Sequence, residues 1–318
     1  MRKRRMLVTG GSGFIGSHLV HRLLREGAEV GITVRYRDVI KNERLRDCWD
    51  DLCVFEADVR NRGALEIVRQ FAPELVFHLA AYNHVGQSFA QVEECFDVNA
   101  KGTANILDVC GDGAAKFIYV STSEVYGHQT TVPFDETMNP EPISPYAITK
   151  YAGELYCRMK QRIGGDTSII ILRPFNTFGP YQSAKAVIPE LIINCLRGNP
   201  LRTTTGEQTR EFNYVGNIVE GLVRAANHPE RIDGVMNLAA GEEVSIRELV
   251  SKIAALTNTR SQIEAGALPY RPNEIFRMYA DGSRARRALG WQPQVGLDEG
   301  LKLTVEWFRQ YYRNELDN

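Results

Sequence analysis

The segment Thr9-Gly10-Gly11-Ser12-Gly13-Phe14-Ile15-Gly16 decides the fold. It follows the apolar run Met6–Val8 and opens the amphipathic stretch Phe14–Glu26, which is the strand, loop and helix context of a dinucleotide-binding turn. The glycine spacing permits a tight turn, close approach of the backbone to a pyrophosphate and close helix packing, and the N–H groups at the helix start favour an anion. A purely structural strand-to-helix turn is the alternative. The predicted cofactor contacts in this loop are Gly10, Gly13, Phe14, Ile15 and Gly16.

Outward from this loop, the first half of the chain alternates short apolar runs with amphipathic stretches, which is typical of strands and crossover helices around a parallel sheet. After Leu172 the pattern is broken by proline and glycine. We therefore predict an α/β fold with a Rossmann-type, doubly wound parallel sheet and a smaller, partly interleaved C-terminal substrate lobe. The Rossmann domain is expected over residues 1–173 and about 212–240, and the lobe over 174–211 and 241–318. The predicted strands are Met6–Val8, Val30–Val34, Leu52–Phe55, Leu75–His78, Phe117–Val120, Ser168–Leu172 and Val235–Leu238, and the predicted helices are Phe14–Glu26, Ala64–Phe71, Val92–Cys110, Tyr146–Arg162, Ile246–Leu256 and Leu297–Tyr312.

The composition narrows the class of protein. Lys and Arg total 38 against 39 for Asp and Glu, which gives no electrostatic reason to expect nucleic acid or an anionic membrane as a partner. The basic cluster Arg2–Arg5 is followed by only three apolar residues, too few for a signal peptide, and no apolar run approaches a membrane span. The six cysteines form no Cys-x-x-Cys pair. We therefore expect a cytoplasmic protein with free thiols and no metal site.

The residues after the second and third predicted strands border the expected adenosine site. Arg35 follows Val34 where many NAD sites carry an acidic residue, and a guanidinium there suits the 2′-phosphate of NADP. We predict NADP, with NAD as the alternative. Asp58 and Val59 are expected beside the adenine.

Two segments supply candidate catalytic groups. Ser121–Gly127 stands at the end of the fifth predicted strand, and Tyr146 and Lys150 are spaced to lie one helical turn apart on one face. A lysine ammonium beside a phenol lowers the pKa of the phenol, so Tyr146 could take a proton from a sugar hydroxyl while hydride leaves for a nicotinamide. A chance surface pair is the alternative for Tyr146 and Lys150 alone.

In combination, these motifs resemble the extended short-chain dehydrogenase/reductase family over nearly the whole chain. The resemblance implies a nucleotide-diphosphate sugar as substrate and a homodimer packed through the helices around residues 92–110 and 146–162. It also implies that Thr122 binds the substrate hydroxyl near Tyr146 and that Asn176 lies near the sugar diphosphate. The matching pieces are Thr9–Gly16, His78-Leu79-Ala80-Ala81, Asn99, Ser121–Gly127, Tyr146–Lys150, Leu172–Asn176 and Arg210–Phe212, of which Ala80, Ala81 and Asn99 add to the predicted cofactor contacts.

Glu124 indicates the reaction within that family. Simple 4-epimerases usually lack an acid at this position, whereas 4,6-dehydratases need one. Once C4 of the sugar is a ketone, a carboxylate can remove the C5 proton while the C6 hydroxyl leaves as water, and hydride then returns to C6. Ser123, or a water, would protonate the departing hydroxyl. The leading hypothesis is a nucleotide-sugar 4,6-dehydratase with Thr122, Ser123, Glu124, Tyr146 and Lys150 as its catalytic residues.

Several alternatives stay open. Thr122-Ser123-Glu124 and His84–Phe89 are similar to GDP-mannose 4,6-dehydratases, but Arg173–Pro189 is more similar to dehydratases of nucleotide-linked N-acetylglucosamine. The nucleotide of the substrate is therefore left open as GDP or UDP. A 4-epimerase or a UDP-glucuronate decarboxylase of the same family is the enzymatic alternative, and a dinucleotide-sensing binding protein is the other. The predicted substrate contacts are Ser88, Asn176, Arg210 and Arg271, and the weaker candidates His78, His84, Tyr126 and Glu274 have structural or surface roles as their alternatives.

Overall fold

A seven-stranded parallel sheet forms the centre of the protein. The computed structural model describes residues 3–35, 43–110, 113–232, 234–270 and 274–313. The strand order is β11-β6-β5-β4-β1-β2-β3, and every neighbouring pair is parallel. The bounds are β1 Arg5–Thr9, β2 Glu29–Val34, β3 Leu52–Glu56, β4 Leu75–His78, β5 Lys116–Val120, β6 Ser168–Pro174 and β11 Gly234–Leu238. The predicted doubly wound fold is confirmed.

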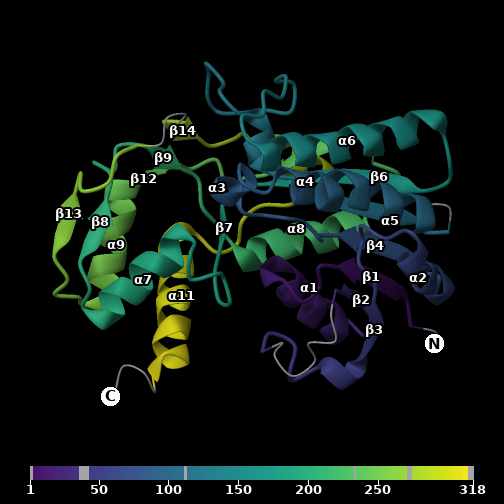
Figure 1. Ribbon diagram of the computed structural model, residues 1–318, viewed down its shortest axis with the longest axis horizontal. Helices are drawn as coiled ribbons and strands as arrows, with labels where there is room; N and C mark the ends of the chain where they lie inside the picture. The colour runs from purple at the N-terminus through teal and green to yellow at the C-terminus, as the bar shows by residue number, and fades with distance from the viewer. Residues whose placement is uncertain (1–2, 36–42, 111–112, 233, 271–273, 314–318) are drawn as a thin grey trace.

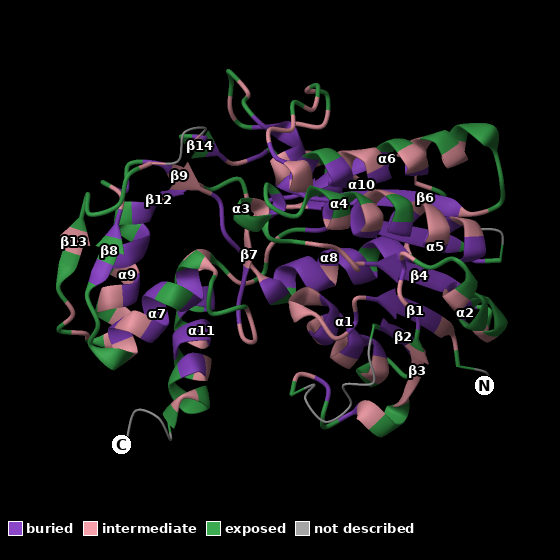
Figure 2. Ribbon diagram, in the orientation of Figure 1, coloured by how far each residue is buried: buried purple, intermediate pink, exposed green. Residues whose placement is uncertain are grey.

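Helices cover both faces of the sheet because alternate side chains of each strand enter different cores (Figure 1). Val8 and Ile32 pack in the core formed with α1 (Phe14–Arg25) and α8 (Val215–Asn227). On the opposite face, Leu7 and Phe117 pack with residues of three other helices. These are α2 (Glu66–Phe71), α5 (Gly102–Cys110) and α6 (Pro145–Ile163). Figure 2 shows the strands of the sheet as largely buried, except for the edge strand β3, which is only partly buried.

A second body of structure lies beside the sheet and has a core of its own. Ile192, Leu249 and Val305 are at most 2% exposed and belong to one cluster. Its helices are α7 (Val187–Arg197), α9 (Ile246–Thr257) and α11 (Leu297–Tyr311). Helix α10 (Ser283–Leu289) follows in the same part of the sequence but packs on β11 of the sheet. Short strands complete this part: β7 Thr177–Phe178, β8 Leu201–Thr203, β9 Thr209–Arg210, β10 Asn213–Tyr214, β12 Val244–Ser245, β13 Ile263–Ala265 and β14 Arg277–Met278. The residue boundaries of the two predicted domains stay predictions.

The segment predicted as one helix over 92–110 is divided. It consists of α4 (Val92–Cys95), a π-helical stretch over Phe96–Lys101 and α5. The π-helical residues include the buried Asn99, one of the predicted cofactor contacts. Single π-helical turns are common at functional positions because they rotate a side chain out of α-helical register. Four further short helices among the described residues are η1 (Trp49–Asp51), η2 (Gly63–Leu65), α3 (Val85–Ser88) and η4 (Ser123–Tyr126).

Candidate active site

The predicted phosphate loop lies where the strand order reverses, between β1 and β4. Gly10 has φ +68°, and a Cβ there would lie 2.8 Å from the backbone nitrogen of Ala80, in the loop after β4. A Cβ on Gly16 would lie 2.2 Å from the carbonyl oxygen of Gly10. Side chains at these two positions would therefore clash with the backbone of the turn and of the loop after β4. Ligands of open α/β sheets bind at this crevice beyond the carboxyl ends of the strands, so the loop fits a dinucleotide.

A buried hydrogen-bond chain fixes the two strand ends on either side of this crevice. The Thr9 hydroxyl lies 2.7 Å from Nδ1 of His78, and Nε2 of His78 lies 3.0 Å from the Thr103 hydroxyl. Thr103 donates to the Asn99 carbonyl, so it accepts from His78 and fixes the proton on Nε2. Burial, together with the nearby Lys150 charge, holds the pKa of His78 well below its usual range. His78 is thus a neutral histidine that links the ends of β1 and β4 to α5.

Charged side chains cluster at the predicted adenosine end. Arg35 is exposed, and its Nη1 lies 3.5 Å from the Glu94 carboxylate. Asp58 accepts from Arg60 through both oxygens, with Arg60 Nη2 2.7 Å from Oδ2. Despite the opposing effect of burial, this guanidinium and that of Arg35 lower the pKa of Asp58. Val59 lies against Gly102, since a Cβ added to Gly102 would lie 2.8 Å from Cγ2 of Val59. The structure brings Arg35 and Asp58 to one end of the sheet.

The Thr122-Ser123-Glu124 segment follows β5 directly. The Thr122 hydroxyl caps the short helix η4 by accepting from the backbone N–H of Glu124 at 3.2 Å. Glu124 is partly exposed. Ser123 is 3% exposed, and its hydroxyl donates to the sulfur of Met278 at 3.8 Å. The partner of Ser123 is therefore a residue of β14.

Helix α6 brings Tyr146 to this strand end. Ser144 caps the helix by accepting from Ala147 N–H at 3.1 Å, and Pro145 begins it. The Tyr146 hydroxyl contacts the Thr122 side chain. Burial raises the pKa of Tyr146 to about 12, the Thr122 contact opposes that rise, and the Glu124 charge adds to it. Tyr146, Thr122 and Glu124 therefore share one site.

Lys150 does not act on Tyr146 as the sequence predicts. Its Nζ lies over the ring of Tyr119, 4.3 Å from the centroid, and the side chain is 2% exposed. Burial lowers the pKa of Lys150 to about 7, while Cys157 and Glu154 oppose that change. The prediction that the lysine lowers the pKa of Tyr146 is wrong for this structure, because burial dominates both groups and the ammonium contacts an aromatic face.

The loop after β4 is tied to the π-helical stretch. The Asn99 side chain accepts from Tyr82 N–H at 2.8 Å and donates to the Tyr82 carbonyl at 3.1 Å. It also donates to the Thr149 hydroxyl on α6 at 3.0 Å. Asn99 thereby positions the backbone beside Ala80 and Ala81, and its amide is occupied by protein partners. Ser88 is fully buried and donates to the Val85 carbonyl at 2.6 Å.

Two of the predicted substrate residues, Asn176 and Arg210, lie in or beside the second body of structure. Asn176 donates to the Glu211 carbonyl at 2.9 Å. Arg210 donates to the carbonyl of Ile275 at 2.6 Å and forms an ion pair with Glu274. Arg210 and Glu274 were separate candidates in the sequence, and their ion pair was not predicted. Arg271 lies outside the described residues.

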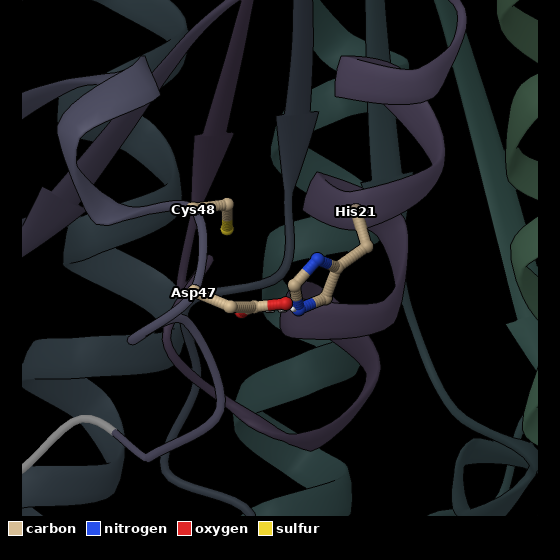
Figure 3. A group of neighbouring side chains, drawn as sticks. All are labelled: His21, Asp47 and Cys48. Carbon is tan, nitrogen blue, oxygen red and sulfur yellow. Dashed lines mark ion pairs between the residues drawn. The ribbon is translucent and has the colours of Figure 1, made fainter.

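One cluster in the described residues has the side-chain types of a metal site. His21, Asp47 and Cys48 bring ligand atoms within 4.8 Å of one another (Figure 3). However, Nε2 of His21 lies 2.8 Å from the Arg44 carbonyl, to which it donates, so that nitrogen has no lone pair for a metal. Burial raises the pKa of Cys48 to about 11, and the charges of Asp47 and Asp51 add to the rise. With Nε2 engaged, only Nδ1 of His21 could bind a metal, and the raised pKa of Cys48 disfavours the thiolate that such a site needs.

Sequence reasoning missed several residues that hold the site together. Glu154 accepts from Ser121 and Arg173 and is fully buried, and Tyr119 donates to the Lys150 carbonyl at 2.9 Å. Glu211 accepts from the N–H groups of Ala240 and Ala280, and burial raises its pKa to about 7. A charged residue on the apolar face of a helix, four positions after Lys150, was the one available signal for Glu154.

The comparisons with known proteins agree with this arrangement. The sequence model of the GDP-mannose 4,6 dehydratase family matches residues 7–304 of the chain. The chain is 34% identical to a UDP-glucose 4-epimerase of Mycolicibacterium smegmatis, covering 96% of this chain and 98% of that protein. It is 31% identical to a dTDP-D-glucose 4,6-dehydratase of Mus musculus, covering 98% and 90%.

A solved structure of UDP-glucuronic acid 4-epimerase from Bacillus cereus, in complex with UDP-glucuronic acid and NAD, superposes with a TM-score of 0.87. The identity is 29%, with 97% of this chain and 100% of that chain covered. No helix among the described residues has the length and apolar character needed to span a bilayer. The motifs, the sheet order and these matches over nearly the full length agree, and the chain belongs to the extended short-chain dehydrogenase/reductase family, in its epimerase and dehydratase branch.

Proposed function

We propose that this protein is a nucleotide-sugar 4,6-dehydratase that uses a nicotinamide dinucleotide. The observation that carries the proposal is the placement of the Glu124 carboxylate beside Tyr146, close enough for its charge to raise the pKa of that phenol. A dehydratase needs a base for the C5 proton near the group that deprotonates the C4 hydroxyl. Thr122 holds both residues, since it contacts the Tyr146 hydroxyl and accepts from the Glu124 N–H.

The roles of the chain's own groups follow from their positions. Tyr146 would take the proton of the C4 hydroxyl, and Thr122 would orient that hydroxyl. A bound nicotinamide dinucleotide supplies the hydride acceptor and a positive ring charge, which favours the phenolate. Glu124 would remove the C5 proton. The contact of Ser123 with Met278 favours a water over Ser123 as the donor to the departing hydroxyl.

An epimerase is the second candidate, and a specific observation favours it. The relative of 34% identity is a UDP-glucose 4-epimerase, and an epimerase needs the Tyr146 group without a base at C5. The proposed substrate of either reaction is a sugar linked to UDP or GDP, in line with the UDP-sugar in the superposed structure. The product distinguishes the two reactions, because dehydration removes one water and epimerisation leaves the mass unchanged.

NADP is the proposed form of the cofactor. Arg35 and Arg60 place two guanidinium groups near the end of β2, where the adenosine ribose is expected. Glu94 lies 3.5 Å from Arg35 and partly offsets its charge, and the superposed epimerase holds NAD. The balance between these effects sets the preference between the two dinucleotides.

A homodimer through α6 is part of the proposal. Four apolar side chains spaced along one face of α6 are 40–73% exposed: Ile148, Leu155, Met159 and Ile163. Phe89, Val92 and Phe96 add exposed apolar surface on neighbouring segments. A stripe of this kind on a helix is buried in most stable proteins. An exposed apolar stripe of this kind suits a second copy of the chain about a two-fold axis.

The test uses Glu124→Gln against a panel of UDP- and GDP-sugars, with products read by mass spectrometry. The wild type is expected to release a 4-keto product lighter by one water. The variant is expected to lose dehydration by roughly 10²–10⁴-fold, because a general base contributes that much to rate. Glu93→Gln, a change on the exposed surface of α4, is the matched control. A product of unchanged mass from the wild type would establish epimerisation instead.

A further inference from the structure

Glu154 lies one helical turn beyond Lys150 on α6 and is completely buried. Its Oε1 accepts from the Ser121 hydroxyl at 2.5 Å and from Nε of Arg173 at 2.8 Å. Its Oε2 accepts from Nη2 of Arg173 at 2.7 Å. Ser121 immediately follows β5, and Arg173 belongs to β6. One carboxylate therefore joins the helix and two neighbouring strand ends.

We propose that Glu154 is a positioning residue for the Tyr146 and Lys150 pair, fixing the depth and rotation of α6 against the ends of β5 and β6. The inference rests on the proposed function, because that function gives Tyr146, one member of the pair, the task of proton transfer. Ser121 directly precedes Thr122, whose side chain contacts the Tyr146 hydroxyl. A shift at Glu154 is therefore transmitted to both partners of that contact.

The form of the ion pair favours positioning over stability alone. Burying two charges costs solvation, and well-packed apolar side chains often stabilise a core equally well. A bidentate guanidinium–carboxylate pair instead fixes the relative orientation of the two side chains as well as the distance between them. Arg173 is held in turn, since its guanidinium lies 4.6 Å from the centroid of the Tyr126 ring, and the Tyr126 hydroxyl donates to Asn237 at 2.7 Å.

Glu154 also acts on Lys150 through its charge. The groups that face Lys150 are the Tyr119 ring, the His78 ring, Cys157 and Glu154. Glu154 is the carboxylate that opposes the effect of burial on the pKa of Lys150. Loss of its charge therefore moves the titration of Lys150 to lower pH.

The informative variant is the double change Glu154→Gln with Arg173→Met. A single Glu154→Gln change leaves a buried guanidinium without its partner, which endangers folding, whereas the double change removes both charges. Melting temperature verifies the fold, and NMR of isotope-labelled lysine side chains follows the titration of Lys150 without substrate. We expect kcat to fall by about 10²-fold with KM changed far less, because small misplacements of reacting groups cost that much. The Lys150 midpoint is expected to move to lower pH.

Two further variants separate the effects. Glu154→Asp keeps the charge but shortens the side chain, so the Lys150 midpoint is expected to stay near that of the wild type while kcat falls. Lys160→Gln is the control, since it removes the 2.7 Å ion pair of Lys160 with Asp108 from the same helix, away from the strand ends, and should change neither quantity.

A folded double variant with the kcat of the wild type would overturn the proposal. If the wild type converts no nucleotide sugar, the proposed function fails by itself. The Lys150 titration then still decides the present inference, and an unshifted midpoint in the folded double variant refutes it.

Discussion

Lys150 holds a charge at a position that is 2% exposed, and its Nζ lies 4.3 Å from the centroid of the Tyr119 ring. Its pKa near 7 is far below the value of a solvated lysine, so the folded protein binds fewer protons at this residue than the unfolded chain between pH 7 and about 10.5. Stability contributed by this group therefore rises with pH over that window. Below pH 7 the cost of burying the ammonium is present in full.

Replacing Lys150 with methionine should separate stability from function. Lys150→Met removes the buried charge but keeps the length of the side chain, so we expect the free energy of unfolding at pH 6 to rise by about 2 kcal/mol. The gain should largely disappear near pH 10.5, where the wild-type lysine is neutral in the folded state and half deprotonated in the unfolded chain. Turnover should be lost. Urea unfolding at the two pH values measures the effect, and a less stable variant at pH 6 would contradict it.

Arg35 tests the choice of dinucleotide. Arg35→Ala should weaken NADP binding by about 10-fold or more, because a hydrogen bond between charged groups contributes roughly 1.5–3 kcal/mol. NAD has no 2′-phosphate, so its affinity should change little. Titration calorimetry with both dinucleotides gives the ratio. Arg69→Ala, which removes an exposed arginine of α2 paired with Glu66, is the control. Equal losses for the two dinucleotides would assign Arg35 to surface charge alone.

At the scale of elements, the turn from β1 to α1 depends on missing side chains. A Cβ on Gly16 would lie 2.2 Å from the Gly10 carbonyl oxygen, so backbone has to move. Gly16→Ala should cost roughly 1–3 kcal/mol of stability and lower dinucleotide affinity at least 10-fold. Gly113→Ala is the matched control, since a Cβ there meets nothing within 4 Å. Thermal unfolding and dinucleotide titration measure both effects, and a variant that binds normally would show that the turn tolerates a side chain.

The elements also show where sequence reasoning succeeds. The seven sheet strands were predicted within two residues at each end, because strands buried on both faces are continuous apolar runs such as Ser168–Leu172. Helices α7, α8 and α10 were missed. None of the three has a side-chain cap, since Ala186, Tyr214 and Gly282 occupy their N-cap positions, so the N-cap residue gives no start signal. Two-residue strands such as β9 are too short to show a period.

The candidate site was predicted unevenly for the same kind of reason. Residues that a spacing rule connects, such as Tyr146 and Lys150, were found together with the strand-end Thr122 that contacts Tyr146. Contacts between residues far apart in the chain, such as Glu154 with Arg173, depend on the packing of α6 against β6. No local pattern encodes that packing. The predicted effect of Lys150 on Tyr146 failed because it considered charge and left out burial.

For the whole molecule, the exposed face of α6 makes the oligomeric state testable. Leu155→Arg places a charge in the middle of the apolar stripe and should shift a dimer to monomer, because an unpaired charge in an apolar interface costs several kcal/mol. Ile67→Arg is the control, an equally exposed apolar residue (49% for each) on α2, outside the stripe. Sedimentation velocity of the three proteins gives the answer. A wild type that sediments as a monomer would refute the proposed dimer.

The position of β11 at the edge of the sheet, next to β6, has a consequence for synthesis of the protein. The ribosome must translate from Pro174 to Leu238 before β6 can acquire this neighbour, which takes on the order of several seconds. During that interval the isoleucine-rich strand Ser168–Pro174 presents unsatisfied amide and carbonyl groups to other nascent chains. Slow decoding or early termination within this interval would keep the edge of this strand unpaired for longer and would promote aggregation of the product.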